Sequence, residues 1–157
     1  DPGFSQSDSH PVVCITAAMA DDYARWLSQM SARAYRLPSS AELATIGVEA
    51  AKDCSANVRD ASYRAQFGGR ASLACSDGHA ATSPVTAFPA SSAGLFDTLG
   101  NVRQWTADCV GGACRERRVA GGSWASDPGD GATRAFPADT GFNTIGLRVV
   151  REIPLTK

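Results

Sequence analysis

The sequence has no excess of charge of either sign and no long apolar run. Its 157 residues include 15 Lys and Arg and 16 Asp and Glu, which gives a net charge of -1. A chain balanced in this way has no long-range field that would attract nucleic acid or an anionic membrane. A membrane-spanning helix needs about 20 consecutive apolar residues, and no such run occurs. We therefore expect no nucleic-acid partner, no membrane insertion by this chain, and partners found by shape and local chemistry.

Groups that usually carry catalysis are also scarce. The two histidines, His10 and His79, are too few for a three-histidine iron site, and no Cys-x-x-Cys pair indicates zinc. Gly121-Gly122-Ser123 lacks the Gly-x-Ser-x-Gly form of a serine nucleophile turn. The glycine-rich pieces do not follow a strand and open a helix, as a phosphate-binding loop does. The composition therefore gives no support to these reaction types.

The chain has five cysteines, which is many for a cytosolic domain of this size. Cys109 and Cys114 bracket a short Val-Gly-Gly-Ala loop, and Cys54 and Cys75 flank a polar insertion, so each pair is expected to form a disulfide. Cys14 lies in an apolar run and is expected to be a buried free thiol. This arrangement favours a periplasmic or extracellular location. Five free thiols in a reducing compartment remain the alternative.

Two helices have clear sequence signals. Thr16 is a capping residue before an amphipathic stretch, in which Ala20, Tyr23, Ala24, Leu27 and Met30 recur at helical spacing and are expected to face the core. Further on, Ser39 and Glu42 have the spacing of a capping box, which predicts a second helix running to about Gly47.

The rest of the chain predicts short strands and loops. Strands are expected at residues 12–15, 85–88, 119–120 and 146–151. Residues 52–84 show no periodicity and are expected to form loops held by a disulfide or a metal rather than by a core. The polar residues 1–9 are expected to be loose, and the length suits one domain over residues 10–153.

Five segments occur in an order that resembles a known family. They are His10-Pro-Val-Val-Cys-Ile15, Arg36-Leu-Pro-Ser-Ser-Ala-Glu-Leu43, the stretch from Gly94 to Asp108 containing Gly-Asn-Val-Arg-Gln-Trp, Arg118-Val-Ala-Gly-Gly-Ser-Trp124, and Ile145-Gly-Leu-Arg-Val-Val-Arg151. In this order they resemble the formylglycine-generating enzymes, or sulfatase-modifying factors. The resemblance implies an α+β fold, a loop-rich variant of the C-type-lectin fold with little regular secondary structure. That family usually has strands before the first segment, so we expect the C-terminal part of a longer protein.

The resemblance implies a structural calcium site. Its ligands would be the Asn57 side chain, the Val58 carbonyl, the Asp77 carboxylate and the His79 carbonyl, which are hard oxygen donors of the kind calcium takes. The alternative is that Asn57 and Asp77 only cap turns.

A second calcium site of the family would use Asn101 and the position of Gln104. Here Gln104 stands where the family has Glu, and the neighbouring Arg103 stands where it has Trp. With one negative charge lost and a cation added, we expect weak calcium binding at most. A structural turn in which Arg103 pairs with a nearby carboxylate is the favoured alternative.

The main departure from the family follows Trp124. Active members carry two cysteines in this region, which bind copper(I), and thiolates are the ligands that copper(I) selects. This chain has no cysteine after Cys114, so we expect no copper. The groove that holds the substrate in the family would then be a recognition site for a protein or a small molecule. Its expected residues are Arg103, Trp124, Asp127, Asp130, Arg134 and Phe136. The alternative is that Trp124 belongs to the core and that the acidic residues are solvated loop tips.

Two functions follow from the resemblance. The first is a non-catalytic sensor or partner-binding domain, such as the extracytoplasmic part of a bacterial membrane Ser/Thr kinase. The second is an oxidoreductase whose metal ligands lie outside this chain, as in family relatives that use iron. The sequence names neither the ligand nor the oligomeric state.

Overall fold

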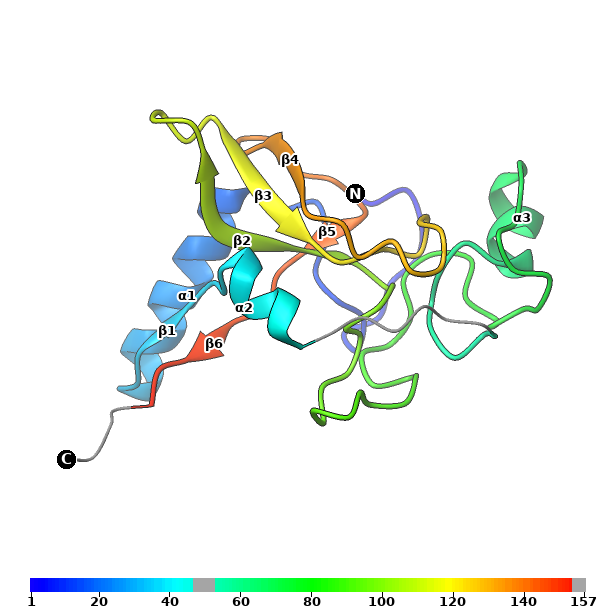
Figure 1. Ribbon diagram of the computed structural model, residues 1–157, viewed down its shortest axis with the longest axis horizontal. Coiled ribbons are helices and arrows are strands. Elements are labelled where there is room, and N and C mark those ends of the chain that lie inside the picture. Colours follow the sequence, from blue (N-terminus) through cyan, green and yellow to red (C-terminus); the bar gives the residue numbers. More distant parts are fainter. Residues whose placement is uncertain (47–52, 154–157) are drawn as a thin grey trace.

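The computed structural model describes residues 1–46 and 53–153 of the chain. A twisted sheet occupies the middle, the longest helix lies at one end, and a loop-rich region with a short helix lies at the other (Figure 1). The elements are α1 (Ala17–Ser31), β1 (Tyr35–Arg36), α2 (Ser40–Thr45), α3 (Ala61–Phe67), β2 (Arg103–Val110), β3 (Glu116–Ala120), β4 (Arg134–Pro137), β5 (Ile145–Gly146) and β6 (Val150–Arg151).

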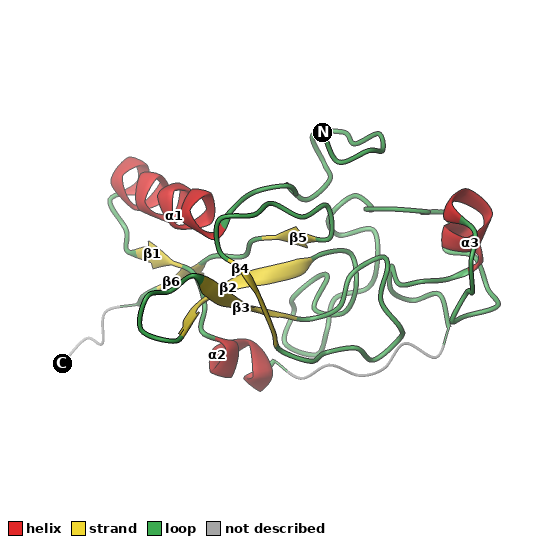
Figure 2. Cartoon of the chain, turned by 90° about the horizontal axis from the view of Figure 1, so that it is seen from above, coloured by secondary structure: helices red, strands yellow, loops and turns green. Residues whose placement is uncertain are grey.

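The main sheet has four strands in the order β4-β3-β2-β5. β2 and β3 form an antiparallel hairpin whose register shifts between Trp105 and Cys109, and β5 runs parallel to β2. β1 and β6 form a separate two-stranded sheet. Seen from above, α1 and α2 lie on opposite sides of the main sheet (Figure 2). The result is a small α+β frame from which long loops extend.

The first helix begins where the sequence predicts. The Thr16 side chain accepts a hydrogen bond from the Met19 amide and so satisfies one of the free donors of the first turn. The prediction that Tyr23 and Met30 face the core was wrong, because both are exposed, Met30 to 69%. The helix packs through Ala17, Ala20 and Ala24 instead. Their small side chains let the helix come close to the frame, which turns the larger side chains outward.

The capping box of the second helix is confirmed. Ser39 accepts from the Glu42 amide, and the Glu42 carboxylate accepts from the Ser39 amide. Glu42 also receives two hydrogen bonds from Arg36, which hold its pKa at about 2 together with the Ser39 amide. The helix ends at Thr45, and the expected end at Gly47 lies outside the described residues.

Two predicted strands are wrong. Residues 12–15 and 85–88 contain Cys14 and Thr86, whose φ angles are 59° and 73°. A left-handed residue turns the chain out of the extended path that a ladder of hydrogen bonds needs. The predicted strand at residues 119–120 is part of β3, and the one at 146–151 is divided between β5 and β6.

The main core lies between α1 and the sheet. Trp105 is fully buried there with Leu37, Val119 and Ile145, and its indole NH donates to the Ile15 carbonyl at 3.0 Å. In the described part of the loop-rich region, apolar packing consists of a small cluster around Ala56 and Val58 and of the aromatic rings around Trp124. The order of this region must therefore depend on polar contacts and covalent links more than on apolar burial.

Asn101 joins three loops of that region. Its amide donates to the Asn57 carbonyl at 2.8 Å, and its carbonyl accepts from the Trp124 amide at 2.9 Å. Its side chain donates to the Ser83 carbonyl and accepts from the Ser83 amide. Asn101 itself has a φ of 54°, which Asn tolerates better than most residues.

The first nine residues, which we expected to be loose, contact the body of the domain. The Phe4 ring packs edge-on against Trp124 with 5.4 Å between ring centroids. Gln6 donates to the Thr82 hydroxyl, and Asn143 donates to the Pro2 carbonyl. No helix of the described residues is both long and apolar enough to cross a membrane.

A substitution at Gly100 would test how closely the loops that carry Asn57 and Asn101 approach each other. A Cβ there would lie 2.1 Å from the Asn57 carbonyl oxygen, and φ is +79°. We expect Gly100→Ala to destabilise the fold by about 1–2 kcal/mol for the left-handed backbone and by about 1–3 kcal/mol more for the clash. Urea unfolding measures both together.

Gly69 is the matched control, because its φ is +78° and a Cβ would meet nothing within 4 Å. Gly69→Ala should show only the backbone cost. Equal losses of stability in the two variants would contradict the close approach.

Candidate functional site

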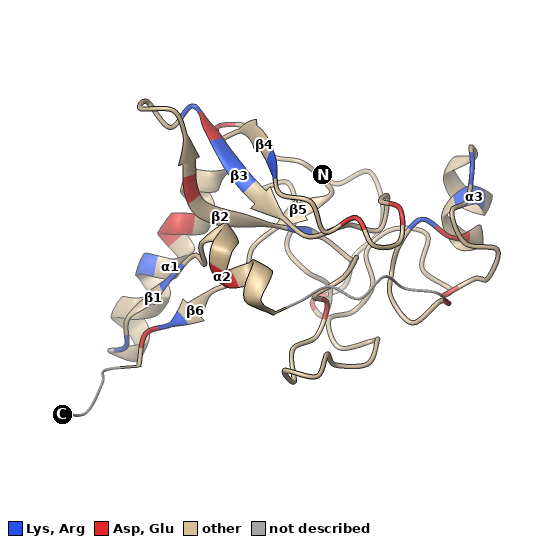
Figure 3. Ribbon diagram, viewed as in Figure 1, with Lys and Arg blue, Asp and Glu red and all other residues tan. Residues whose placement is uncertain are grey.

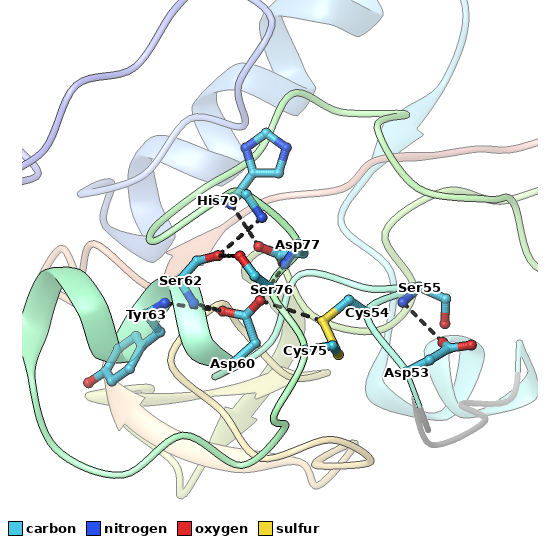
Figure 4. Close-up of a disulfide and its surroundings, with 11 residues drawn as sticks. Asp53, Cys54, Ser55, Asp60, Ser62, Tyr63, Cys75, Ser76, Asp77 and His79 are labelled. Carbon is cyan, nitrogen blue, oxygen red and sulfur yellow. Dashed lines mark hydrogen bonds between the residues drawn. A yellow bond between two sulfur atoms is a disulfide. The ribbon is translucent and has the colours of Figure 1, made fainter.

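The cysteine pairing is as expected. Cys54 pairs with Cys75 and Cys109 with Cys114, with Cα–Cα distances of 6.0 Å and 4.8 Å. Both distances lie in the ordinary range for disulfides. Cys14 is the free cysteine, but it is only partly buried, whereas we expected full burial. The first disulfide closes the loop that contains Asn57 and Val58, and Asp77 and His79 follow it directly (Figure 4).

Asp60 organises this loop, and it was missed from the sequence. It is fully buried, and one carboxylate oxygen accepts from the amides of Ser62 and Tyr63 at the start of α3. The other accepts from the Asp77 amide at 2.6 Å. Figure 4 shows the carboxylate of Asp60 between these amides. An Asp directly before a helix is a capping signal, but the glycine-rich surroundings hid the helix.

Hydrogen bonds tie down the segments that carry the expected calcium ligands. The Asn57 amide nitrogen donates to the Ala81 carbonyl at 2.8 Å, which ties residue 57 to the turn that follows Asp77. One oxygen of Asp77 accepts from the His79 amide at 2.7 Å. Val58, whose carbonyl is the fourth expected ligand, is fully buried.

Two oxygens at this place have no donor among the described residues. They are Asn57 Oδ1 and Asp77 Oδ2, and both are buried. A buried acceptor without a partner costs about 1–3 kcal/mol, so a native structure normally matches it. Both are oxygens of the kinds that calcium binds, an amide oxygen and a carboxylate oxygen. By the chemistry of their donor atoms, these residues fit the ion that the resemblance implies.

The pKa of Asp77 also fits a nearby cation. Burial raises the pKa of the Asp77 carboxyl to about 6, and the nearby Asp60 carboxylate contributes. A divalent cation would oppose both effects and keep the group ionised.

The residues of the second expected calcium site do not fit that ion. Both polar atoms of the Asn101 side chain are used by Ser83. The Gln104 oxygen accepts from Arg148 Nε at 3.0 Å, so a guanidinium already provides its positive partner. A calcium ion at this place would have to displace a cation.

Arg103 lies inside the domain. It is only 8% exposed, and it donates to the Gly121 carbonyl, the Ser126 hydroxyl and the Asp130 carboxylate at 2.6, 2.9 and 2.7 Å. Burial alone would raise the pKa of Asp130, but hydrogen bonds from Arg103 and Arg134 hold it below its usual value. The expected pairing of Arg103 with a local carboxylate is confirmed. Its expected place on an open recognition surface is not.

Two other residues of the expected recognition site are packed. Trp124 is 6% exposed and lies among the rings of Phe4, Tyr63 and Phe67, and its indole NH donates to Asn143. Phe136 is half-buried and packs edge-on against Phe142. Size and residue type alone did not reveal that these rings have partners elsewhere in the chain.

Three other side chains, on α3, on the segment after Trp124 and on β4, are exposed. Asp127 is exposed and contacts Arg59 and Ser72, and Arg134 is exposed and contacts Asp130. Phe67 on α3 is 43% exposed while its other side stacks on Trp124 at 5.2 Å. We call the exposed side chains of Phe67, Asp127 and Arg134 the α3 face. Phe67 was missed because α3 itself was not predicted.

Comparison with known proteins identifies the same family that the sequence segments resemble. The family model for the sulfatase-modifying factor enzyme 1-like domain matches residues 1–153. The serine/threonine-protein kinase Pkn1 of Chlamydia trachomatis serovar L2 is 33% identical over 108 residues, which are 69% of this chain and 15% of the kinase. The chain thus spans a small part of this relative.

Solved structures share the fold. The structure of PvdO from Pseudomonas aeruginosa superimposes with a TM-score of 0.75 at 27% identity, over 98% of this chain and 66% of that one. The structure of CarF gives a TM-score of 0.72 at 21% identity, over 96% and 71%. The predicted loop-rich variant of the C-type-lectin fold is confirmed.

Calcium should stabilise the protein. A ligand bound only by the native state adds about 2.7 kcal/mol at a hundredfold excess over its Kd. We expect the melting temperature to rise with millimolar calcium and to fall with a chelator, and Asp77→Ala to remove this response. Asp53→Ala is the control, because Asp53 is exposed in the same loop. A wild-type melting temperature indifferent to calcium would contradict the assignment.

The effect of calcium on stability should depend on pH through the Asp77 carboxyl. Without calcium, the folded pKa of Asp77 is about 6 and the ordinary value is 3.8, so its contribution to stability is greatest at low pH and is lost as the pH rises through 6. Calcium needs the ionised form. The calcium-induced shift in melting temperature should therefore be large near pH 7.5 and small near pH 5, which thermal scans at both values measure.

We expect Arg103 to stabilise the folded domain. Arg103→Ala leaves Asp130 buried without its strongest partner, and breaking a buried pair costs about 3–5 kcal/mol. Arg134→Ala removes an exposed pair with the same Asp130 and should cost at most about 1 kcal/mol. Denaturant unfolding compares them. Similar losses in both variants would show that Arg103 is not the internal link described here.

Proposed function

Because the chain belongs to the family of sulfatase-modifying factor enzyme 1-like domains, we propose that it uses that fold as a non-catalytic binding domain. The observation that carries this proposal is the state of the thiols. Four of the five cysteines are in disulfides, and Cys14 is the one left. A copper(I) site of the family type needs two thiolates.

The segment after Trp124 supports the same proposal. Ser126 is buried, and its hydroxyl accepts from Arg103 and from the Ser123 amide. Asp130 pairs with Arg103 from the other side. The polar groups of these side chains hydrogen-bond to one another, so the network stabilises the fold and offers no reactive group to a substrate.

The α3 face is the recognition surface in this proposal. Phe67 offers an exposed ring, while Asp127 and Arg134 offer one charge of each sign. Trp124 packs against the Phe67 ring, and Asp130 pairs with Arg134. Exposed aromatic and arginine side chains held by such contacts are common in binding sites. The ligand is a protein or a small molecule of matching shape.

We further propose an extracytoplasmic, periplasmic or extracellular, location. Two disulfides suit an oxidising compartment. The similarity to part of Pkn1 favours a sensor or partner module of a signalling protein such as a membrane Ser/Thr kinase. Figure 3 shows acidic and basic residues interspersed along the chain, which favours specific contacts over attraction by net charge.

The catalytic and binding roles can be separated by experiment. We expect the purified protein, supplied with copper(I), to leave a cysteine-bearing sulfatase-type peptide unchanged by mass spectrometry. On peptide and glycan arrays, a ligand bound by the wild type should lose at least about tenfold in affinity in the double variant Phe67→Ala, Arg134→Ala, because hot spots combine contact area with directed donors.

Met30→Ala serves as the control, since Met30 is exposed on α1, far from α3 (Figure 1). Neither the double variant nor the control should change the melting temperature by more than a few degrees. Turnover of the peptide would overturn the non-catalytic role. Normal array binding by the double variant would place recognition elsewhere on the domain.

A further inference from the structure

A cavity with a volume of about 290 Å³ lies in the loop-rich region, and none of the residues of the α3 face lines it. Its walls come from the loop at residues 85–97 and from the segment after β5. Most of the lining is apolar, and Val85, Leu95, Phe96 and Leu147 contribute. Cavities of this size and composition, with a few polar groups, are typical of small-molecule sites.

One polar group on the cavity is the guanidinium of Arg148. Its hydrogen bonds go to the Gln104 oxygen and to the carbonyls of Phe96 and Asp97, which are all uncharged groups. Nη1 makes no hydrogen bond within residues 1–46 and 53–153, and no ion pair to Arg148 occurs there. Burial lowers the pKa of Arg148, as expected for a cation whose charge is not fully compensated.

The other charged group on the cavity is Asp97. It is partly buried, and burial raises the pKa of its carboxyl. Asp97 and Arg148 line the same cavity but do not form an ion pair in the described part of the chain. The two groups attract each other without direct contact, and attraction to Arg148 opposes the effect of burial on the pKa of Asp97. Two opposite charges without direct contact at an apolar wall are complementary to a molecule that carries both charges.

The backbone around this cavity is unusual. Thr86 and Asp97 both line it, and their φ angles are 73° and 52°. A β-branched residue in the left-handed region is a true outlier, and such residues gather at ligand-binding sites.

The geometry points to a binding site for an apolar α-amino acid. Its α-carboxylate would pair with Arg148 and its α-ammonium with Asp97, while its side chain would pack against Leu95, Phe96 and Leu147. A free amino acid with an aliphatic or aromatic side chain has the two charges and the apolar body that this cavity offers. The site is independent of the α3 face and of its ligand.

Isothermal titration of the full chain with L-leucine tests the site. We expect saturable binding, and at least about tenfold weaker binding of N-acetyl-leucine, of leucinamide and of glycine, since each lacks one of the three matched features. Asp97→Asn and Arg148→Gln should each weaken leucine binding by a similar factor. Asp97→Asn should lose less affinity for N-acetyl-leucine, which lacks the ammonium group, and Arg148→Gln should lose less affinity for leucinamide, which lacks the carboxylate.

Because Arg148 also holds two loop carbonyls, a second variant avoids loss of folding. Val85 is 45% exposed at the cavity, so Val85→Trp should fill the cavity and abolish leucine binding while leaving the melting temperature unchanged. Met30→Trp on α1 is the matched control and should bind as the wild type does. The proposal is overturned if leucine shows no saturation up to about 10 mM. It is also overturned if N-acetyl-leucine or leucinamide binds as tightly as leucine, or if Val85→Trp binds normally.

Discussion

The half of the domain that carries the loops depends on the backbone contact between Asn57 and Asn101. The Asn101 amide reaches the Asn57 carbonyl because Gly100 has no side chain to keep the two segments apart. From Asn101 the contacts continue to Ser83 and to Trp124, so one residue fixes the positions of three loops. Asn57, which we propose as a calcium ligand, Trp124 with its aromatic cluster, and Asn101 at the wall of the cavity are all linked at this point.

The loop-rich half replaces a core with other sources of order. Its apolar cluster is centred on two small residues, Ala56 and Val58, which cannot offset the entropy of ordering so many residues. The Cys54–Cys75 disulfide restricts the unfolded chain, and the Asp60 carboxylate binds three backbone amides. Among the described residues, the oxygens Asn57 Oδ1 and Asp77 Oδ2 are buried in this network without a donor, and a cation is our proposed partner for them.

Local signals in the sequence predicted local structure well. The caps at Thr16 and Ser39 were found because a cap depends on residues only three positions apart. The pairing of the cysteines followed from their spacing. The calcium ligands came from the resemblance and stay a prediction. The strand predicted at residues 12–15 failed because a left-handed Cys14 is imposed from outside, where the Phe142 carbonyl accepts from its amide.

Burial was the property that the sequence did not reveal. Arg103 looks like a surface residue by type, but Asp130 and the Gly121 carbonyl, which follow it by 27 and 18 positions, give it partners inside the fold. Trp124 is covered by Phe4 and by α3, which come from parts of the chain without periodicity. In a fold built on loops, the residues that bury a side chain are set by topology and not by pattern.

Arg103 and Arg148 show how the same residue type serves two purposes in one small domain. Arg103 forms an ion pair with Asp130 inside the fold, and this pair holds the segment after Trp124 in place. Arg148 binds only uncharged oxygens, although Asp97 lies on the same cavity. A half-buried cation that is hydrogen-bonded but has no ion pair keeps an attraction for an anion. Arg103 therefore contributes to structural order, whereas Arg148 is the arginine to which our proposal assigns the binding of a charged group.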